Sequence, residues 1–252
     1  MIVDETIQKL TELRLTTMAQ ALRQMLDSPQ SHDLSFEDKL GMLVDREWLE
    51  RDNRRVARRI KEAKLPIAAN LEEVASDPAR GLDKSVLRSL AACQWIKAKQ
   101  NIIVHGATGV GKSFLGASFA QTACRHGYRA LYVRVPRLVH HLSVARADGS
   151  YASELGRISR FDVLVLDDFL IAPMKDTERR DLLEVLEDRY DHSSTVITSQ
   201  VPPKTWHEML ADPTIADAIC DRLVHNAHVL WLKGPSMRKK KGLDSKDQST
   251  TT

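Results

Sequence analysis

The sequence predicts an α/β protein, with a parallel sheet flanked by helices and a small all-helical domain in front of it. A glycine-rich stretch at 106–113 lies between a β-branched run and an apolar helical run, in the order strand, loop, helix. Further short apolar runs, at 130–135, 162–168 and 195–200, are separated by longer segments, as the strands of a parallel sheet are. Before residue 65 the apolar residues recur at helical spacing.

The N-terminal region is predicted to form helices. Apolar residues at helical spacing predict two short helices within residues 5–26. Ser35 then offers an N-cap, with Asp38 three residues further on. The helix that begins there is expected to run to Lys64, because Pro66 prevents its continuation. One face of this helix is an apolar stripe, formed by Phe36, Leu40, Leu43, Val44 and Trp48.

The second half of this long helix is strongly basic. Residues 51–64 contain seven basic side chains and two acids, a local balance of +5. A solvated helix face is the usual explanation of such a run. The alternative is a surface that contacts phosphates, because arginines on a rigid helix suit a nucleic-acid backbone. On the second interpretation the DNA-contacting residues are Arg51, Arg54, Arg55, Arg58 and Arg59.

The next segments lead to the sheet. Residues 65–82 contain prolines and a glycine with little periodicity, which is typical of a linker. Residues 83–98 are predicted to form one helix, whose inward side chains are Val86, Leu87, Leu90 and Trp95. After the second strand, Pro136 suits the first turn of another helix, which bears Arg137 and Arg146.

The glycine-rich stretch satisfies the P-loop pattern G-x-x-x-x-G-K-[ST] at every fixed position. Its glycines let successive backbone N–H groups converge on a phosphate at a helix N-terminus, where the macrodipole favours an anion. The lysine is expected to reach the β- and γ-phosphates of a nucleotide, and the serine to bind Mg²⁺. The predicted nucleotide-binding residues are Gly106, Ala107, Thr108, Gly109, Val110, Gly111, Lys112 and Ser113.

The apolar strand at 162–168 ends in two carboxylates, Asp167 and Asp168. A buried strand holds the first acid rigidly where it can bind Mg²⁺, and a second acid can polarise the attacking water. We therefore predict Asp167 as a metal ligand beside Ser113, and Asp168 as the catalytic acid. Asp168 is one methylene shorter than the glutamate more usual at this position.

Two later segments supply candidates for contacts with the γ-phosphate. The strand at 195–200 ends in polar residues, of which Thr198, Ser199 or Gln200 is expected to hold that phosphate or the attacking water. The alternative is a simple strand cap. Further on, Arg222 lies on an amphipathic helix, where it either pairs with its neighbours or projects to a bound nucleotide as an arginine finger.

The order of these parts resembles that of the AAA+ ATPases, and within them the helicase-loader clade. Three later motifs narrow the resemblance to the IstB family, the ATPase helpers of insertion-sequence transposition. These are Thr198-Ser199-Gln200-Val201-Pro202 followed by Trp206-His207, Asp217-Ala218 with Asp221-Arg222-Leu223-Val224-His225, and Gly234-Pro235-Ser236-Met237-Arg238-Lys239.

The resemblance implies an ATP-dependent regulator that assembles with its own copies on double-stranded DNA, selects a target site and engages a transposase. It implies ATP and Mg²⁺ as cofactors, Ser199 or a neighbour as the first sensor, and Arg222 as the finger offered to the adjacent subunit. It makes Arg238 the second-sensor arginine and places Arg137 and Arg146 toward the central channel, as a rival DNA surface. Only twenty residues follow Leu232, so no full C-terminal lid is expected.

Composition narrows the remaining possibilities. The formal net charge of +3 is too small to identify a partner, and the three cysteines form no C-x-x-C pair. No metal-ligand cluster is evident. An apolar stretch long enough to cross a bilayer is missing, and so is a signal peptide, which predicts a cytoplasmic protein without a membrane partner.

We therefore expect an N-terminal helical domain at 1–66, an ATPase domain at 67–235 and a basic tail at 236–252. Two other functions use the same P-loop. A replicative helicase loader is the neighbouring alternative to the transposition regulator. A small-molecule kinase is the more distant one, and it lacks an evident substrate lid in this sequence.

Overall fold

The computed structural model describes residues 2–28, 31, 33–74 and 76–237. Of the predicted basic tail, Arg238 and residues 239–252 lie outside the described residues. The chain divides into two compact units between Arg58 and Arg59. Each unit is described by itself below.

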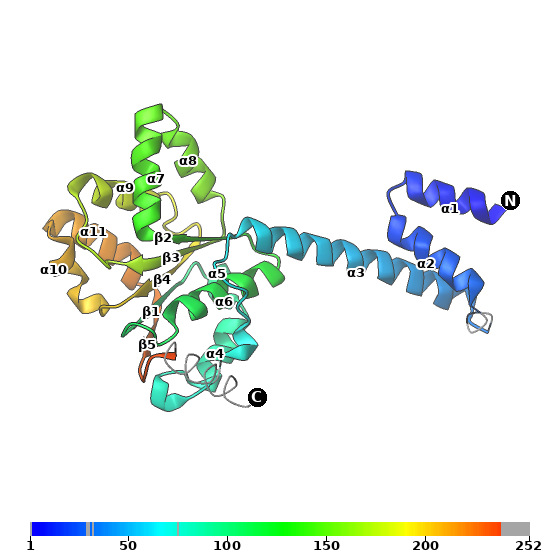
Figure 1. The fold of residues 1–252 in the computed structure, drawn as a ribbon, viewed down its shortest axis with the longest axis horizontal. Helices are drawn as coiled ribbons and strands as arrows, with labels where there is room; N and C mark the ends of the chain where they lie inside the picture. The colour runs from blue at the N-terminus through cyan, green and yellow to red at the C-terminus, as the bar shows by residue number, and fades with distance from the viewer. Residues whose placement is uncertain (1, 29–30, 32, 75, 238–252) are drawn as a thin grey trace, which may run out of the picture. The chain divides into compact units, whose positions relative to one another are not determined.

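The first unit contains α1 (Ile2–Glu12), α2 (Thr16–Asp27) and most of α3 (Phe36–Glu62) (Figure 1). The predicted cap is present, because the Ser35 hydroxyl accepts the backbone N–H of Asp38 at 3.1 Å. Helix α3 ends at Glu62 instead of Lys64, since the Lys64 backbone takes a left-handed conformation with φ of 53°.

The predicted apolar stripe on α3 is mostly not part of a core. Of its five residues only Leu43 is buried, together with Ile7, Ala19 and Ala21 from the two shorter helices. The buried side of α3 also holds a charged residue, Glu47, whose carboxylate accepts the Met18 N–H at 2.8 Å. The stripe residues that are exposed are Phe36, Leu40, Val44 and Trp48.

The second unit is the predicted α/β fold. Its five parallel strands lie in the order β2-β3-β4-β1-β5. The strands are β1 (Asn101–Gly106), β2 (Ala130–Arg134), β3 (Val163–Phe169), β4 (Ser194–Ser199) and β5 (Ala227–Leu232). The helices are α4 (Lys84–Ala91), α5 (Gln94–Lys97), α6 (Lys112–Arg125), α7 (Val135–Asp148), α8 (Tyr151–Ser159), α9 (Asp176–Glu187), α10 (Trp206–Leu210) and α11 (Pro213–Val224).

Helices cover both faces of the sheet (Figure 1). Alternate residues of β1 point to opposite faces, as in any strand. Ile102 and Val104 pack with α6 in one buried cluster, whereas Ile103 belongs to a second cluster with α7 and α9 to α11. The strands are therefore buried on both sides, which explains their nearly continuous apolar sequences.

Parallel pairing brings the carboxyl ends of the strands to one edge of the sheet. The register aligns Val104 of β1 with Thr198 of β4, so the P-loop after β1 lies beside the polar end of β4. Strand β3, next to β4, is irregular between Leu166 and Phe169, and Asp168 there has a φ of 58°. This irregularity presents two adjacent carboxylates at the same edge.

Two predicted elements are wrong in detail. The single helix at 83–98 is divided into α4 and α5, because Cys93 between them adopts a left-handed φ of 56°. Val86, predicted to point inward, is 39% exposed. None of the described helices is both long enough and apolar enough to span a bilayer.

Residues 65–82 are more than a linker, because part of the segment is fixed against β5. The Lys233 N–H donates to the Arg80 carbonyl at 3.0 Å. Gly81 has a φ of 78°, and a Cβ there would lie 2.0 Å from the Trp231 carbonyl oxygen. Only glycine fits this close approach.

Candidate nucleotide-binding site

The P-loop begins the site. Gly111, with a φ of 103°, is the N-cap of α6, so the loop's backbone turns directly into the helix N-terminus. The Lys112 ammonium lies back over the loop and donates to the carbonyls of Gly106 at 2.9 Å and Ala107 at 2.8 Å. Lys112 is only 9% exposed. The loop thus has the predicted strand–loop–helix setting, with its lysine side chain folded against the loop's own carbonyls.

A cavity of about 470 Å³ opens over the loop. Its volume is within the range usual for nucleotide-sized ligands. Its lining comes from the loop, the start of α6, the 67–82 segment, the carboxyl ends of β3, β4 and β5, and the chain after β5. The lining residues are Ile67, Glu73, Val74, Arg80, Leu82, Thr108, Gly109, Val110, Gly111, Lys112, Ser113, Phe114, Leu115, Asp168, Gln200, Leu232 and Met237.

The apolar side of this cavity does not follow from the sequence. The Arg80 guanidinium donates to the Val110 carbonyl at 2.9 Å, and the Met237 N–H donates to the Gly109 carbonyl at 2.9 Å. These contacts fasten two segments distant in sequence onto the P-loop. The scattered apolar residues of the 65–82 segment are its only sequence signal, and without periodicity they indicate nothing more than a linker.

Asp167 is held at the centre of the site. It is 4% exposed and lies at the end of β3. The Ser113 hydroxyl donates to its Oδ1 at 2.9 Å, and the Thr198 hydroxyl donates to the same oxygen. Burial, followed by a hydrogen bond to Asp167, raises the pKa of Tyr132, so this phenol stays protonated.

These side chains fit Mg²⁺. The ion prefers hard oxygen ligands, and it usually takes one or two from protein side chains and the rest from phosphates and water. The hydroxyl of Ser113 and the carboxylate of Asp167 already lie within 2.9 Å of each other beside the P-loop. Both belong to the set predicted from the sequence.

Asp168 has an unpredicted partner. Arg134, the last residue of β2, donates through its Nε to Asp168 Oδ2 at 2.6 Å, and one of its terminal nitrogens forms an ion pair with the same oxygen at 2.6 Å. Asp168 also lines the cavity. The carboxylate predicted to polarise water is therefore bound by an arginine of its own chain, and the raised pKa of Arg134 reflects first this hydrogen bond and then the charge of Asp168.

The polar residues at the end of β4 make different contacts. Thr198 faces α6 and contacts Asp167, as described above. Ser199 faces the other way and donates to the Phe169 carbonyl at 2.9 Å, so its hydroxyl is not brought to the P-loop. Gln200 does contact the P-loop, because its side-chain oxygen accepts a hydrogen bond from the Thr108 hydroxyl at 3.0 Å. Of the three alternatives, Gln200 is the one in contact with the loop.

Arg222 lies far from its own P-loop. Asn101, the first residue of β1, donates through its side chain to the Arg222 carbonyl at 2.9 Å, whereas the P-loop follows the last residue of β1. The guanidinium donates to the carbonyl of Ala218 and to Glu187 Oε1 at 2.8 Å. Within this chain, Arg222 therefore pairs with a neighbour and does not enter the cavity.

The predicted DNA-contacting arginines differ in their freedom. Arg51 bonds to Glu47 at 2.7 Å and to the Arg14 carbonyl, and Arg54 pairs with Glu50. Arg146 is bound by Asp181 and Glu184 and stacks over Tyr151. By contrast, the side chains of Arg55, Arg58, Arg59 and Arg137 have no hydrogen bond or ion pair within the described part of the chain.

A family model for "IstB-like ATP binding protein" matches residues 8–245 of the chain. The chain belongs to this family. An IstB-like relative in Sinorhizobium fredii, y4pL, is named as an insertion sequence ATP-binding protein; it is 44% identical over 95% of this chain and 98% of its own length. The insertion sequence IS21 ATP-binding protein of Pseudomonas aeruginosa is 31% identical over 92% of this chain and 87% of its own.

Solved structures share the fold of this IstB-like chain. The DnaC helicase loader superposes with a TM-score of 0.53 at 18% identity, covering 66% of this chain and 97% of DnaC. AMPPCP-bound DnaA from Aquifex aeolicus gives 0.58 at 15% identity, covering 75% of this chain and 57% of that one. The predicted fold class, including the AAA+ arrangement, is confirmed.

Proposed function

We propose that this IstB-like protein is an ATP-dependent, DNA-binding regulator of transposition. On this proposal it binds ATP and Mg²⁺ at the P-loop, assembles with its own copies on double-stranded DNA and engages a transposase in the cytoplasm. The main support is the convergence of Lys112, Ser113 and Asp167 at one edge of the sheet, in a chain whose relatives are named for insertion sequences and ATP binding.

The nucleotide is held mainly by the loop. Backbone N–H groups at the start of α6 and the Lys112 ammonium bind the phosphates, and the apolar wall between residue 67 and Leu82 covers the base. Ser113 and Asp167 hold Mg²⁺, which neutralises phosphate charge when it is bound. For its ammonium to bind a phosphate, Lys112 exchanges its present carbonyl contacts for phosphate oxygens, which are stronger acceptors.

Hydrolysis is assigned to the residues around Asp168. Its carboxylate accepts a proton from the attacking water, while Thr198 keeps Asp167 in place and Gln200 lies over the loop. Arg134 must release or re-orient Asp168 for this, because its guanidinium occupies a carboxylate oxygen, Oδ2, at 2.6 Å.

Asp168→Asn is expected to separate binding from turnover. The amide is similar in size but cannot accept a proton, while Ser113 and Asp167 remain as metal ligands. ATP affinity should stay within about threefold, whereas the hydrolysis rate should fall by roughly 10²- to 10⁴-fold. Nucleotide titration and phosphate release give the two values. Asp176→Asn, an exposed change on α9, is the matched control. Persistent hydrolysis in Asp168→Asn would show that another residue activates the attacking water.

The oligomer is inferred from the position of Arg222. The Arg222 carbonyl is bonded to Asn101 at the start of β1, and the P-loop begins at the other end of that strand. The length of β1, roughly 16 Å or more, therefore separates Arg222 from its own P-loop. A guanidinium at that end of the sheet can stabilise transition-state charge only in the site of an adjacent copy. We therefore place each ATP between two subunits.

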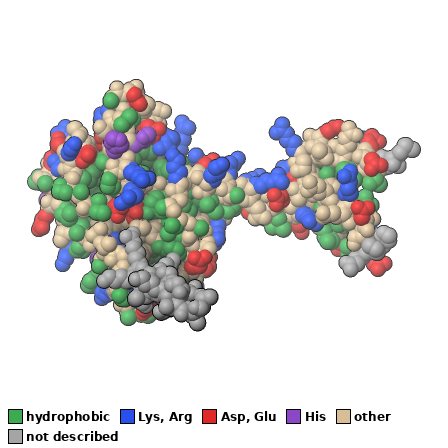
Figure 2. All heavy atoms as spheres, viewed as in Figure 1, with side chains coloured by type: hydrophobic (Ala, Val, Ile, Leu, Met, Phe, Trp, Pro, Cys, Tyr) green, Lys and Arg blue, Asp and Glu red, His purple; other side chains and the backbone are tan. Residues whose placement is uncertain are grey.

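DNA contact is assigned to the exposed arginines of the second half of α3. Arg55 and Arg58 are free within the described residues, and contacts of this kind position a protein on phosphates without reading bases. Figure 2 shows Lys and Arg side chains along this helix. Arg146 is a weaker candidate, because two carboxylates already bind it.

Changing Arg54, Arg55, Arg58 and Arg59 to Gln should flatten the dependence of log affinity on log salt concentration by about 0.9 for each phosphate that the helix no longer binds. The measurement is duplex binding across a salt series with ATP present. Arg137→Gln/Arg146→Gln is the comparison variant and is expected to keep the wild-type slope. An unchanged slope in the fourfold variant would show that DNA binds another surface of the protein.

A replicative helicase loader is the second candidate, favoured by the superposition on DnaC. Both functions use an ATPase core of this fold, so the partner distinguishes them. The test is co-purification of the chain with an insertion-sequence transposase and, separately, with a replicative helicase.

A further inference from the structure

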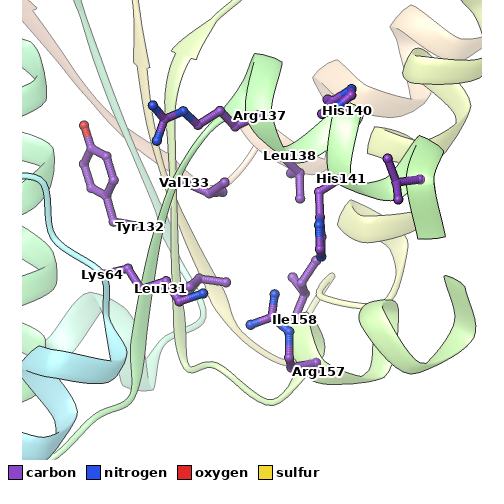
Figure 3. Close-up of a pocket in the computed structure, with 11 residues that line it drawn as sticks. Lys64, Leu131, Tyr132, Val133, Arg137, Leu138, His140, His141, Arg157 and Ile158 are labelled. Atoms are coloured by element: carbon purple, nitrogen blue, oxygen red, sulfur yellow. The ribbon is translucent and has the colours of Figure 1, made fainter. Parts of the chain in front are cut away.

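A second cavity lies away from the nucleotide site, against the outer strand of the sheet. Its volume is about 520 Å³. It is bounded by β2, by α7 and α8, and by Lys64 in the segment after α3 (Figure 3). None of the functional residues assigned above faces it except Arg137. No sequence pattern indicates this cavity, since its walls come from three segments that are distant along the chain.

Five of the residues around this cavity have basic side chains. They are Lys64, Arg137, His140, His141 and Arg157. Figure 3 shows them surrounding one space from α7, α8 and the Lys64 segment, and Figure 2 shows histidines gathered over α7 with Lys and Arg beside them. None of the described lining residues is acidic.

Only part of this charge is already neutralised. The carboxylate of Glu154 lies 2.9 Å from Arg157 and 3.0 Å from His141, so these two side chains share one negative partner. Neither Lys64 nor Arg137 has a side-chain hydrogen bond or ion pair within the described residues. The cavity therefore retains two full positive charges without a partner, and it attracts an anion.

The floor of the cavity is apolar. Leu131, Leu138 and Ile158 form its buried base, while Val133 is half-buried and Val144 is 48% exposed at the rim. A ligand that fills the space must bring both negative charge and apolar surface. A nucleic-acid backbone supplies the first only, because phosphates and sugars would leave the valine side chains uncovered. Carboxylates interspersed with aliphatic side chains supply both.

We propose that this cavity docks an acidic, extended peptide segment of a partner protein, with carboxylates at Lys64 and Arg137 and an aliphatic side chain on Val133 and Val144. The proposal does not depend on ATP hydrolysis or on DNA binding by α3. Pockets of this size with an apolar floor and a few charged groups are typical anchors for interface side chains. The site is formed wholly within the second unit of the chain.

The test uses the full chain with methyl-labelled Leu, Ile and Val. The probe is a short serine–glycine peptide that contains several leucines and glutamates, and its twin has glutamine in place of each glutamate. A short DNA duplex is the third ligand. We expect the acidic peptide to shift the methyl signals of Leu131, Val133 and Val144, and the twin and the duplex to leave them unshifted.

Lys64→Glu/Arg137→Glu should lower the affinity for the acidic peptide by about tenfold or more, because it reverses the charges of two partly exposed ion pairs. A lysine version of the peptide should bind this variant better than it binds the wild type. Lys84→Glu/Arg88→Glu, the same double charge reversal on exposed residues of α4 outside the cavity, is the matched control. ATP affinity reports whether each variant is folded. If the double variant does not fold, Arg137→Gln alone should still weaken the peptide measurably.

Three results would overturn the proposal. The first is an absence of shifts at these methyl groups. The second is equal binding of the glutamate and glutamine peptides, or of the acidic peptide by the wild type and the folded variants. The third is a duplex that shifts the same signals and loses affinity in the double variant, which would assign the cavity to DNA.

Discussion

Lys112→Ala is expected to abolish detectable ATP binding at concentrations that only just saturate the wild type. The ammonium is the only cation in the P-loop, and its present partners include two carbonyl oxygens of the same loop. Arg80, the other cation of the cavity, donates to the Val110 carbonyl. Losing a charged hydrogen bond to phosphate should cost at least about 100-fold in affinity.

Titration with a fluorescent ATP analogue measures this effect. Lys97→Ala, an exposed lysine on α5, is the matched control and should bind as the wild type does. Because Lys112→Ala also leaves the Gly106 and Ala107 carbonyls without the ammonium, thermal unfolding must show that the variant is still folded. Undiminished affinity in a folded Lys112→Ala protein would contradict the assignment of the P-loop.

Arg222→Ala is expected to reduce ATP hydrolysis by roughly 10³- to 10⁵-fold while leaving ATP affinity nearly unchanged. The arginine cannot reach the nucleotide of its own chain, since its backbone is bonded to Asn101 at the opposite end of β1. Its guanidinium pairs with Glu187 on the surface, where each side chain keeps some exposure, so an adjacent subunit can draw it away.

A mixture of Arg222→Ala with Lys112→Ala should recover part of the activity. Mixed interfaces then join an intact P-loop from one copy to an intact arginine from the other. Glu187→Gln is the matched control, because it removes the same ion pair but keeps the arginine, and it should hydrolyse ATP normally. If no mixture of the two inactive proteins hydrolyses ATP, Arg222 has a structural role.

The parts of the fold and site that can be predicted depend on local sequence. The P-loop is eight consecutive residues, and Asp167 follows an apolar strand. Because parallel strands end at one edge, the two have to meet once the strands are identified. The contact of Ser113 with Asp167 at 2.9 Å is consistent with this reasoning.

The features that cannot be predicted depend on contacts between distant residues. Arg134 meets Asp168 because β2 and β3 are neighbours in register, and no short pattern marks that pair. Arg146 is taken by Asp181 and Glu184 from α9, which spacing along α7 does not indicate. The apolar residues of the α3 stripe recur at helical spacing, but most of their side chains are exposed. Periodicity predicts that these residues share one face of the helix and does not show what covers that face.

ATP is expected to control the assembly of this chain on duplex DNA. Sedimentation of the Asp168→Asn protein with a duplex tests this directly, because ATP would stay bound without turnover. With ATP and Mg²⁺ we predict a complex of several subunits on each duplex, and without nucleotide only small, salt-sensitive species. A complex of the same mass with and without ATP, or a single subunit on each duplex under both conditions, would contradict assembly controlled by ATP.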